Sequence, residues 1–227
     1  MVIEFNGLPG MGKTTVTHAL NDKLCDDYNV RLKYCLNESR IGRLLSYLFD
    51  GSAALYVIAR KYTKYSTEQY KKEKLKYIGV LISYYRMYKQ FLKKHTDDIL
   101  IIDQGIIQAL ISIHHDDLIV DTKYLKNIFC FLHKRKIDVA FVNCGNDESV
   151  ASQRIKSRNT FGGRVDVCED DERERVLKIQ ARNFDTIRSE CSRIMNNCKT
   201  VNINMSHCPD ENSDELIKAL NLKEGCK

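Results

Sequence analysis

The sequence predicts an α/β fold in which helices enclose a five-stranded parallel sheet as a three-layer sandwich. Five short apolar runs rich in β-branched residues alternate along the 227 residues with longer stretches of helical periodicity. The chain has only two prolines, Pro9 and Pro209, and no Gly/Ser-rich linker or internal repeat. Because a chain of this length can bury one sizeable core, residues 1–227 are expected to form a single domain.

The expected elements follow from these patterns in chain order. The strands are short enough to be buried on both faces and are expected at Val2–Phe5, Val30–Cys35, Ile99–Asp103, Val139–Cys144 and Thr200–Asn204. The helices are expected at Lys13–Cys25, Arg40–Phe49, Thr67–Lys94, Ile106–His114, Tyr124–Lys134, Glu148–Arg158, Asp171–Asn196 and Asp214–Leu222. This alternation implies parallel strands joined by right-handed crossovers, with ligands bound beyond the carboxyl ends of the strands.

The composition is that of an ordinary globular domain, with a net charge of +6. This small positive excess suits an anionic ligand and is too small to argue for nucleic acid as the partner. Nine cysteines, an odd number without a C-x-x-C pair, favour free thiols and a reducing, cytoplasmic location. The most apolar stretch, Ile99–Ile113, is shorter than a membrane span needs, and no secretory signal pattern occurs, so no membrane association is expected.

Two clusters of side chains have more than one interpretation. Tyrosines alternate with many lysines between Tyr56 and Tyr88, a pattern that can bind single-stranded nucleic acid by stacking. Tyrosines at helical spacing more often form a core or a homodimer face, and that interpretation is favoured here. The run His114, His115, Asp116 and Asp117 resembles metal ligands, but adjacent residues point apart on a helix, so we expect a solvated helix end.

The stretch GLPGMGKTT fits the phosphate-binding pattern G-x-x-x-x-G-K-[ST] and lies between an expected strand and an expected helix. Its glycines allow a tight turn whose backbone N–H groups point at a phosphate chain, and the helix adds its positive dipole end. The alternative is a glycine-rich turn with an exposed lysine. We call this segment the phosphate loop and assign nucleotide binding to Gly7, Pro9, Gly10, Met11, Gly12, Lys13, Thr14 and Thr15.

Lys13 is a candidate catalytic cation, because its ammonium can reach the outer phosphates of a bound nucleotide. The Thr14 hydroxyl can coordinate Mg²⁺, and a second metal ligand is expected at the tip of a neighbouring strand. The run ILIID ends in Asp103, which we assign to the metal and to substrate binding. The alternative role for Asp103 is to cap the helix that begins at Ile106.

Three segments together resemble the P-loop nucleoside and nucleotide kinases, most nearly the thymidylate-kinase-like branch. They are the phosphate loop, IIDQG on the third strand, and RIKSRNTFGGR after the fourth strand. The resemblance covers nearly the whole chain in order and spacing. It implies the P-loop NTPase fold of the nucleotide-kinase type with a helical lid, Mg²⁺ as cofactor and ATP as phosphate donor. The family commonly has a substrate-contacting arginine after the third-strand acid, where this chain has Gln104.

The resemblance also implies a lid at about residues 154–170, which closes arginines over the nucleotide and excludes water. Arg154 and Arg158 are four residues apart and share a helix face, and Arg164 follows a pair of glycines. Phosphoryl transfer needs positive charge on the equatorial oxygens, so Arg158 and Arg164 are expected to be catalytic. Arg154 is expected to bind the nucleotide or to anchor the base of the lid. The alternative is a solvated basic helix end followed by a loop.

The acceptor side is expected near NESRIGR, after the second strand. In the resembled kinases a glutamate near this point takes the proton of the 5′-hydroxyl, or an arginine binds the acceptor phosphate. Glu38 is therefore a candidate general base and substrate contact, and Arg40 and Arg43 are candidates for the phosphate. An acid that favours a helix N-terminus is an equally good interpretation of Glu38. Arg86 on the long helix and Gln104 are further candidate substrate contacts, although a surface arginine is the commoner case at such a helical position.

The expected function is ATP- and Mg²⁺-dependent phosphoryl transfer to a small-molecule acceptor, a nucleoside or a nucleoside monophosphate. The alternatives are a P-loop ATPase or switch module that acts with a protein or RNA partner, and a kinase for another small alcohol. A GTPase is disfavoured because the chain has no N-K-x-D sequence. Fast hydrolysis is disfavoured because the large ATPase families usually carry a glutamate where this chain has Gln104.

Overall fold

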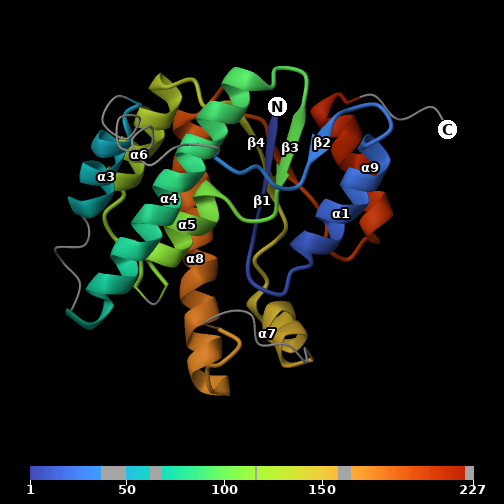
Figure 1. The fold of residues 1–227 in the computed structure, drawn as a ribbon. Coiled ribbons are helices and arrows are strands. Elements are labelled where there is room, and N and C mark those ends of the chain that lie inside the picture. Colours follow the sequence, from blue (N-terminus) through green and yellow to red (C-terminus); the bar gives the residue numbers. More distant parts are fainter. Residues whose placement is uncertain (37–49, 62–67, 116, 158–164, 223–227) are drawn as a thin grey trace.

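The computed structural model describes residues 1–36, 50–61, 68–115, 117–157 and 165–222. These residues form one five-stranded sheet with helices on both of its faces (Figure 1). The expected three-layer α/β fold is therefore confirmed.

All five strands run parallel, in the order β2-β3-β1-β4-β5. The central strand β1 pairs with both β3 and β4, so the carboxyl ends of these three strands meet at one edge of the sheet. The edge strands β2 and β5 are shorter than the sequence predicts, as is common for strands that pair on one side only. The bounds are β1 Val2–Asn6, β2 Val30–Arg31, β3 Ile99–Ile102, β4 Val139–Asn143 and β5 Thr200–Asn202.

Helices form a layer on each side of this sheet (Figure 1). Those described are α1 Lys13–Leu24, α3 Ser52–Arg60, α4 Glu68–Lys94, α5 Ile106–Ile113, α6 Lys123–Lys134, α7 Glu148–Lys156, α8 Asp170–Ile194 and α9 Pro209–Leu220. On one side α1 packs against α9, and on the other side α5 packs between α4 and α8. α7 lies beyond the carboxyl end of β1 and contacts α8.

Two helices differ from the sequence-based expectation. α3 was not expected, and α9 begins at Pro209 instead of Asp214. Its early start has a local cause, because the Cys208 thiol accepts a hydrogen bond from the backbone of Glu211, whose carboxylate accepts one from the Cys208 N–H. Cysteine is an uncommon residue in this role, so the cap was not recognised. The expected helix at Arg40–Phe49 lies outside the described residues.

The core surrounds the central strands, which are buried along their whole length. Tyr85 and Tyr88 of α4 are fully buried, so part of the tyrosine pattern is a core pattern, as expected. Glu4 and Asn6 of β1 are also fully buried, although they are polar. Both therefore need hydrogen-bond partners inside the protein.

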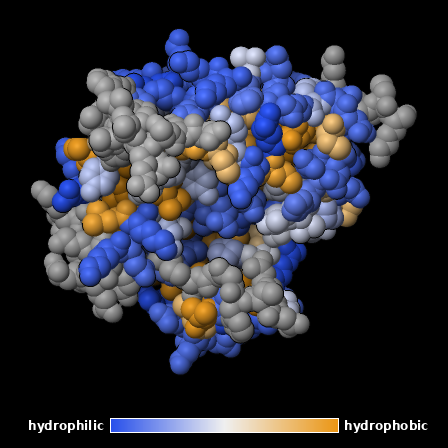
Figure 2. All heavy atoms as spheres, in the orientation of Figure 1, coloured by the Kyte–Doolittle hydropathy of each residue, from blue (hydrophilic) through white to orange (hydrophobic). Residues whose placement is uncertain are grey.

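The molecular surface is largely hydrophilic on the face shown in Figure 2, with hydrophobic residues in separate areas. Among the residues that the structure describes, the large hydrophobic side chains that are exposed are Val57, Leu118, Val120 and Val167. Within the described ranges, no helix has the length and apolar character needed to cross a membrane.

Asn183 of α8 fixes the connection between α5 and α6. Its Nδ2 donates to the carbonyls of His114 at 3.0 Å and Asp117 at 2.9 Å, and its Oδ1 accepts from the Ile119 N–H at 2.9 Å. His114 is buried there with its ring 5.0 Å from that of Tyr124, which corrects the expectation of a solvated helix end. Among the described residues, no group of three or more His, Cys, Asp or Glu side chains could hold a metal.

The buried His114 predicts a loss of stability in acid. Burial lowers its pKa from 6.5 to about 4, and the Lys74 cation acts in the same direction, against Asp117. As the pH falls from about 6.5 to about 4, His114 binds a proton in the unfolded chain but stays neutral in the folded protein. The free energy of unfolding should therefore fall by roughly 2–3 kcal/mol between about pH 7 and pH 4.5 from this residue. The His114→Gln protein should lack this part of the pH dependence. Urea denaturation at both pH values measures the free energy of unfolding, and an equal fall in the wild type and in His114→Gln would contradict the prediction.

Candidate active site

The phosphate loop connects β1 to α1 at the carboxyl edge of the sheet. Gly10 and Gly12 have φ angles of 87° and 86°, in the left-handed region where other residues are strained. Space is also limited, because a Cβ on Gly10 would lie 3.1 Å from the carbonyl oxygen of Ala151. α1 begins at Lys13, within the phosphate loop, so the positive end of the helix dipole lies where an anion would bind.

The Lys13 side chain contacts the first residues of the phosphate loop. Its ammonium donates to the backbone carbonyls of Gly7 at 2.8 Å and Leu8 at 2.9 Å, and the side chain is buried. A phosphate chain surrounded by the loop would therefore meet this cation without a large movement of the side chain.

Thr14 and Asp103 bring two oxygens together beside the loop. The Thr14 hydroxyl, on the first turn of α1, donates to Asp103 Oδ2 at 3.1 Å. A hydroxyl and a carboxylate are hard oxygen ligands of the kind that Mg²⁺ prefers, so this pair fits the expected metal. The alternative role for Asp103 is not observed, because the first N–H groups of α5 donate to Glu4 instead.

Glu4 is a buried acid that the sequence analysis did not assign to the site. Its carboxylate accepts hydrogen bonds from the Tyr88 hydroxyl at 2.8 Å, the Ile106 N–H at 2.9 Å and the Ile107 N–H at 2.7 Å. Burial raises the pKa of Glu4 to about 7, although these three hydrogen bonds act in the opposite direction. An acid inside the apolar strand VIEFN was the available signal. The sequence does not identify its partners, which are 84 or more residues away.

Arg154 contacts the phosphate loop from α7. Its Nη1 donates to the Met11 carbonyl at 3.3 Å. The helix is started by Asp147, whose carboxylate accepts from two N–H groups of the first turn. This position agrees with both expected roles of Arg154, nucleotide binding and anchoring of the lid. The other two lid arginines, Arg158 and Arg164, lie outside the described residues.

The two ends of the expected lid are joined by charged side chains. Lys156 at the end of α7 pairs with Asp170 at the start of α8 at 2.9 Å. Arg173 donates to the same aspartate at 2.6 Å and to the carbonyls of Val165 and Cys168. The ion pair of Lys156 with Asp170 is exposed and therefore contributes little to stability alone. Arg173 is buried, so its hydrogen bonds hold the start of α8 more firmly. These contacts fix where the chain leaves α7 and where it enters α8.

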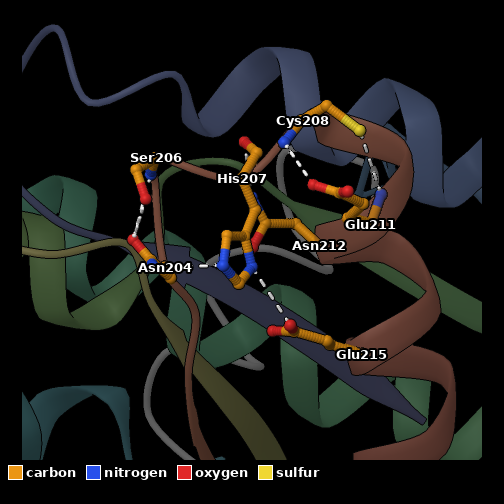
Figure 3. Close-up of polar contacts among 7 residues, drawn as sticks. All are labelled: Asn204, Ser206, His207, Cys208, Glu211, Asn212 and Glu215. Carbon is orange, nitrogen blue, oxygen red and sulfur yellow. Dashed lines mark hydrogen bonds and ion pairs between the residues drawn. The ribbon is translucent and has the colours of Figure 1, made fainter.

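The connection between β5 and α9 is held by a network of side chains (Figure 3). Asn204 Oδ1 accepts from the N–H and hydroxyl of Ser206, at 3.0 and 2.8 Å. His207 lies between Asn204 Nδ2, at 3.2 Å, and Glu215 Oε1, at 3.1 Å. Because the amide nitrogen donates to Nε2, the His207 proton belongs on Nδ1, facing the carboxylate. The network fixes the loop that carries Met205.

Met205 reaches the phosphate loop from this connection. Its Cε lies 3.2 Å from the position that a Cβ on Gly12 would occupy, and Arg154 Nη1 lies 3.8 Å from the same position. Gly12 is therefore approached by side chains from two separate segments, α7 and the connection between β5 and α9. Met205 could not be predicted from the sequence, since an isolated methionine in a polar loop carries no recognisable pattern.

The expected acceptor residues are only partly described. Arg86 is buried and forms an ion pair with Asp50 Oδ2 at 3.2 Å, which joins α4 to the segment before α3. The Asp50 carbonyl also accepts from the Tyr85 hydroxyl at 2.5 Å and from Lys89 at 2.8 Å. Substrate binding by Arg86 stays a prediction. Gln104 is exposed beside the half-buried Asp103, and the other acceptor candidates, Glu38, Arg40 and Arg43, lie outside the described residues.

Two glycine substitutions should have opposite effects on stability. A Cβ on Gly105 would lie 2.1 Å from the Tyr88 hydroxyl and 2.4 Å from the Glu4 carboxyl, and both side chains are buried. Gly105→Ala should therefore lower the free energy of unfolding by roughly 3 kcal/mol or more. At Gly79, on the exposed side of α4, a Cβ would meet nothing within 4 Å. Gly79→Ala should raise stability by roughly 0.5–1 kcal/mol.

Chemical denaturation of both variants measures these changes. A Gly105→Ala protein as stable as the wild type would contradict the close packing of Gly105 against Glu4 and Tyr88. The Gly79 variant controls for the general effect of adding a methyl group to the backbone.

The fold is similar to that of solved nucleoside kinases. The alignment covers 97% of this chain and 99% of a deoxyadenosine kinase from M. mycoides, solved with dCMP and a flexible dCDP bound, at 14% identity and a TM-score of 0.52. The same kinase with bound dATP gives 15% identity and a TM-score of 0.50, over 97% of this chain and 100% of that one. No protein-family model and no curated protein sequence matches. The chain therefore has the fold of the P-loop nucleoside kinases, which confirms the resemblance at the level of fold.

Proposed function

We propose that this protein is an ATP- and Mg²⁺-dependent phosphotransferase that acts on a nucleoside or a nucleoside monophosphate. The observation that carries the proposal is the 3.1 Å contact between Thr14 and Asp103 beside the phosphate loop. A loop able to surround phosphates, next to two oxygens suited to Mg²⁺, supports a nucleoside triphosphate as the donor. The fold shared with a deoxyadenosine kinase supports a nucleoside-type acceptor. The finer assignment to the thymidylate-kinase-like branch rests on the sequence alone.

On the donor side, the chain positions charge and forms no bond to the phosphoryl group. The N–H groups of the phosphate loop, the positive end of α1 and the Lys13 ammonium hold the phosphate chain. Thr14 and Asp103 would hold Mg²⁺, which supplies positive charge to the phosphate oxygens. Arg158 and Arg164 would add positive charge around the transferred group, with Arg154 on the nucleotide. Charge fixed in place before the reaction lowers the barrier without reorganisation.

On the acceptor side, the proposed reaction differs with the substrate. With a nucleoside, Glu38 would take the proton of the attacking hydroxyl as the bond to phosphorus forms and the bond to ADP breaks. With a monophosphate, Arg40 would bind the acceptor phosphate, and its oxygen would attack. Arg86 and Gln104 complete the proposed acceptor contacts.

An ATPase or switch module acting with a protein or RNA partner is the second candidate. The large ATPase families usually carry a glutamate beside the strand-end acid to activate water. The residue there is Gln104, whose amide is exposed and cannot accept a proton at neutral pH. Transfer is therefore favoured over hydrolysis. A kinase for another small alcohol would use the same loop and metal ligands and differ in the acceptor contacts.

The proposed setting is the cytoplasm, with a small molecule as the partner. All cysteines within the described ranges are free thiols, which supports a reducing compartment. We also propose a homodimer, on the ground of the tyrosine pattern of the sequence between Tyr56 and Tyr88.

Replacement of Lys13 should remove catalysis and leave the fold intact. Lys13→Ala is expected to lower acceptor-dependent ATP consumption by roughly 100-fold or more, because a cation on the outer phosphates is lost. The assay supplies ATP, Mg²⁺ and a panel of nucleosides and nucleoside monophosphates, and circular dichroism checks the fold. Lys134→Ala, an exposed lysine at the end of α6, is the matched control and should keep full activity.

The wild-type reaction itself tests the choice between the two candidates. ATP consumption that requires one of the acceptors supports the kinase. Steady hydrolysis without an acceptor, or hydrolysis stimulated only by RNA, would exclude it.

A further inference from the structure

Glu4 holds both ends of the three-residue turn that carries Asp103. In the sheet its backbone pairs with Ile102, the residue directly before Asp103. Its side chain extends past the turn and accepts the N–H groups of Ile106 at 2.9 Å and Ile107 at 2.7 Å. Residues 103–105 therefore lie between two points of contact with Glu4, the pairing with Ile102 before the turn and the hydrogen bonds from Ile106 and Ile107 after it.

α4 packs against the same turn through Tyr88. The Tyr88 hydroxyl donates to Glu4 Oε2 at 2.8 Å, the same oxygen that accepts the Ile106 N–H. A Cβ on Gly105 would lie 2.1 Å from the Tyr88 hydroxyl, so the turn has no space in which to shift toward α4. Glu4 and Tyr88 are both 0% exposed. Water cannot replace their hydrogen bonds, and loss of one would leave a buried polar group unpaired.

A simple helix cap does not account for this arrangement. α7 begins with a cap from the residue next to it, Asp147, and α9 begins with a cap from Cys208. The residue before α5, Gly105, has no side chain, and the cap of α5 comes from a different element, β1, 102 residues earlier. A local Ser, Thr, Asp or Asn would cap α5 without burying a carboxylate in the core. The distant carboxylate, in addition, fixes the position of the turn with Asp103 relative to β1. The phosphate loop begins at the end of this same strand.

We propose that Glu4 is a positioning residue for the oxygen pair of Thr14 and Asp103. By clamping the turn after β3 to β1, it keeps the Asp103 carboxylate 3.1 Å from the Thr14 hydroxyl, which α1 carries at the other end of the phosphate loop. Glu4 itself touches neither oxygen and acts through the backbone of residues 103–107. This role rests on the proposed function, in which the oxygen pair holds Mg²⁺ with the nucleotide.

The test is the effect of Mg²⁺ on ATP binding, measured by calorimetry without an acceptor. For each protein, the ratio of the ATP dissociation constants without and with Mg²⁺ reports how well the oxygen pair holds the metal. Glu4→Gln keeps the shape of the side chain but places an amide N–H against the N–H donors of α5 or the Tyr88 hydroxyl. We expect this ratio to fall by roughly 10- to 100-fold, with the Mg²⁺-free constant within about twofold of the wild type.

Two further variants make the result specific. Asp103→Asn removes the proposed ligand and should lower the ratio at least as far as Glu4→Gln. Asn183→Ala is the matched control, because Asn183 is also buried with three hydrogen bonds but fixes the connection between α5 and α6. It should lower the melting temperature and leave the ratio at the wild-type value.

The outcomes separate the positioning role of Glu4 from the proposed function. A wild-type ratio retained in Glu4→Gln would overturn the positioning role and leave the proposed function intact. A wild-type protein whose ATP affinity does not respond to Mg²⁺ would contradict the proposed function, and the positioning role with it. A lowered ratio in Asn183→Ala would show that general destabilisation explains the effect. If Glu4→Gln does not fold, Tyr88→Phe replaces it, with a ratio several-fold below the wild type expected and an unchanged ratio overturning the role.

Discussion

The parallel pairing of β1 with both β3 and β4 determines where the other parts of the protein can meet. Glu4 lies beside Ile102 of β3, and Asn6 lies beside Asn143 of β4, so the three strands end close together at one edge. The phosphate loop and Asp103 leave the sheet at that edge. Thr14 contacts Asp103 across 89 residues of sequence because the strands that precede them are neighbours. The proposed binding of phosphate and of metal at this edge would therefore be a consequence of strand order.

The same edge concentrates buried polar groups. Asn143 donates to Asn202 of β5 at 2.7 Å, and Arg188 of α8 donates to Asn6 at 2.9 Å. Burial lowers the pKa of Arg188, whose guanidinium lies 5.1 Å from the ring centroid of Phe184. Asn6, Asn143 and Arg188 each also have one buried polar atom without a hydrogen-bond partner in the described part of the chain. Apolar residues would be more stable at such positions, so the retention of polar ones is typical of an edge adapted to a ligand.

Local rules explain what the sequence could predict. The strands, the long helices and the phosphate loop each follow from residues close together in the chain, through apolar periodicity or the conformational freedom of glycine. The burial of His114 depends on Asn183, 69 residues away, and the role of Glu4 depends on residues 84 to 103 positions away. No pattern within a window of the sequence contains such contacts. The start of α9 was missed for a different reason, since its cap is a thiol.

The fixed turn after β3 limits which groups can select the acceptor. Its backbone is held by the β1–β3 pairing on one side and by the Glu4 carboxylate on the other, and Gly105 has no side chain. Asp103 is directed toward Thr14. Gln104 is then the residue of the turn whose side chain is exposed and not engaged in these contacts. Under the proposed function, a neutral amide at this point can donate and accept a hydrogen bond but cannot neutralise a phosphate. Charge recognition of a monophosphate would therefore have to come from other elements, whereas a nucleoside hydroxyl could be bound by the turn itself.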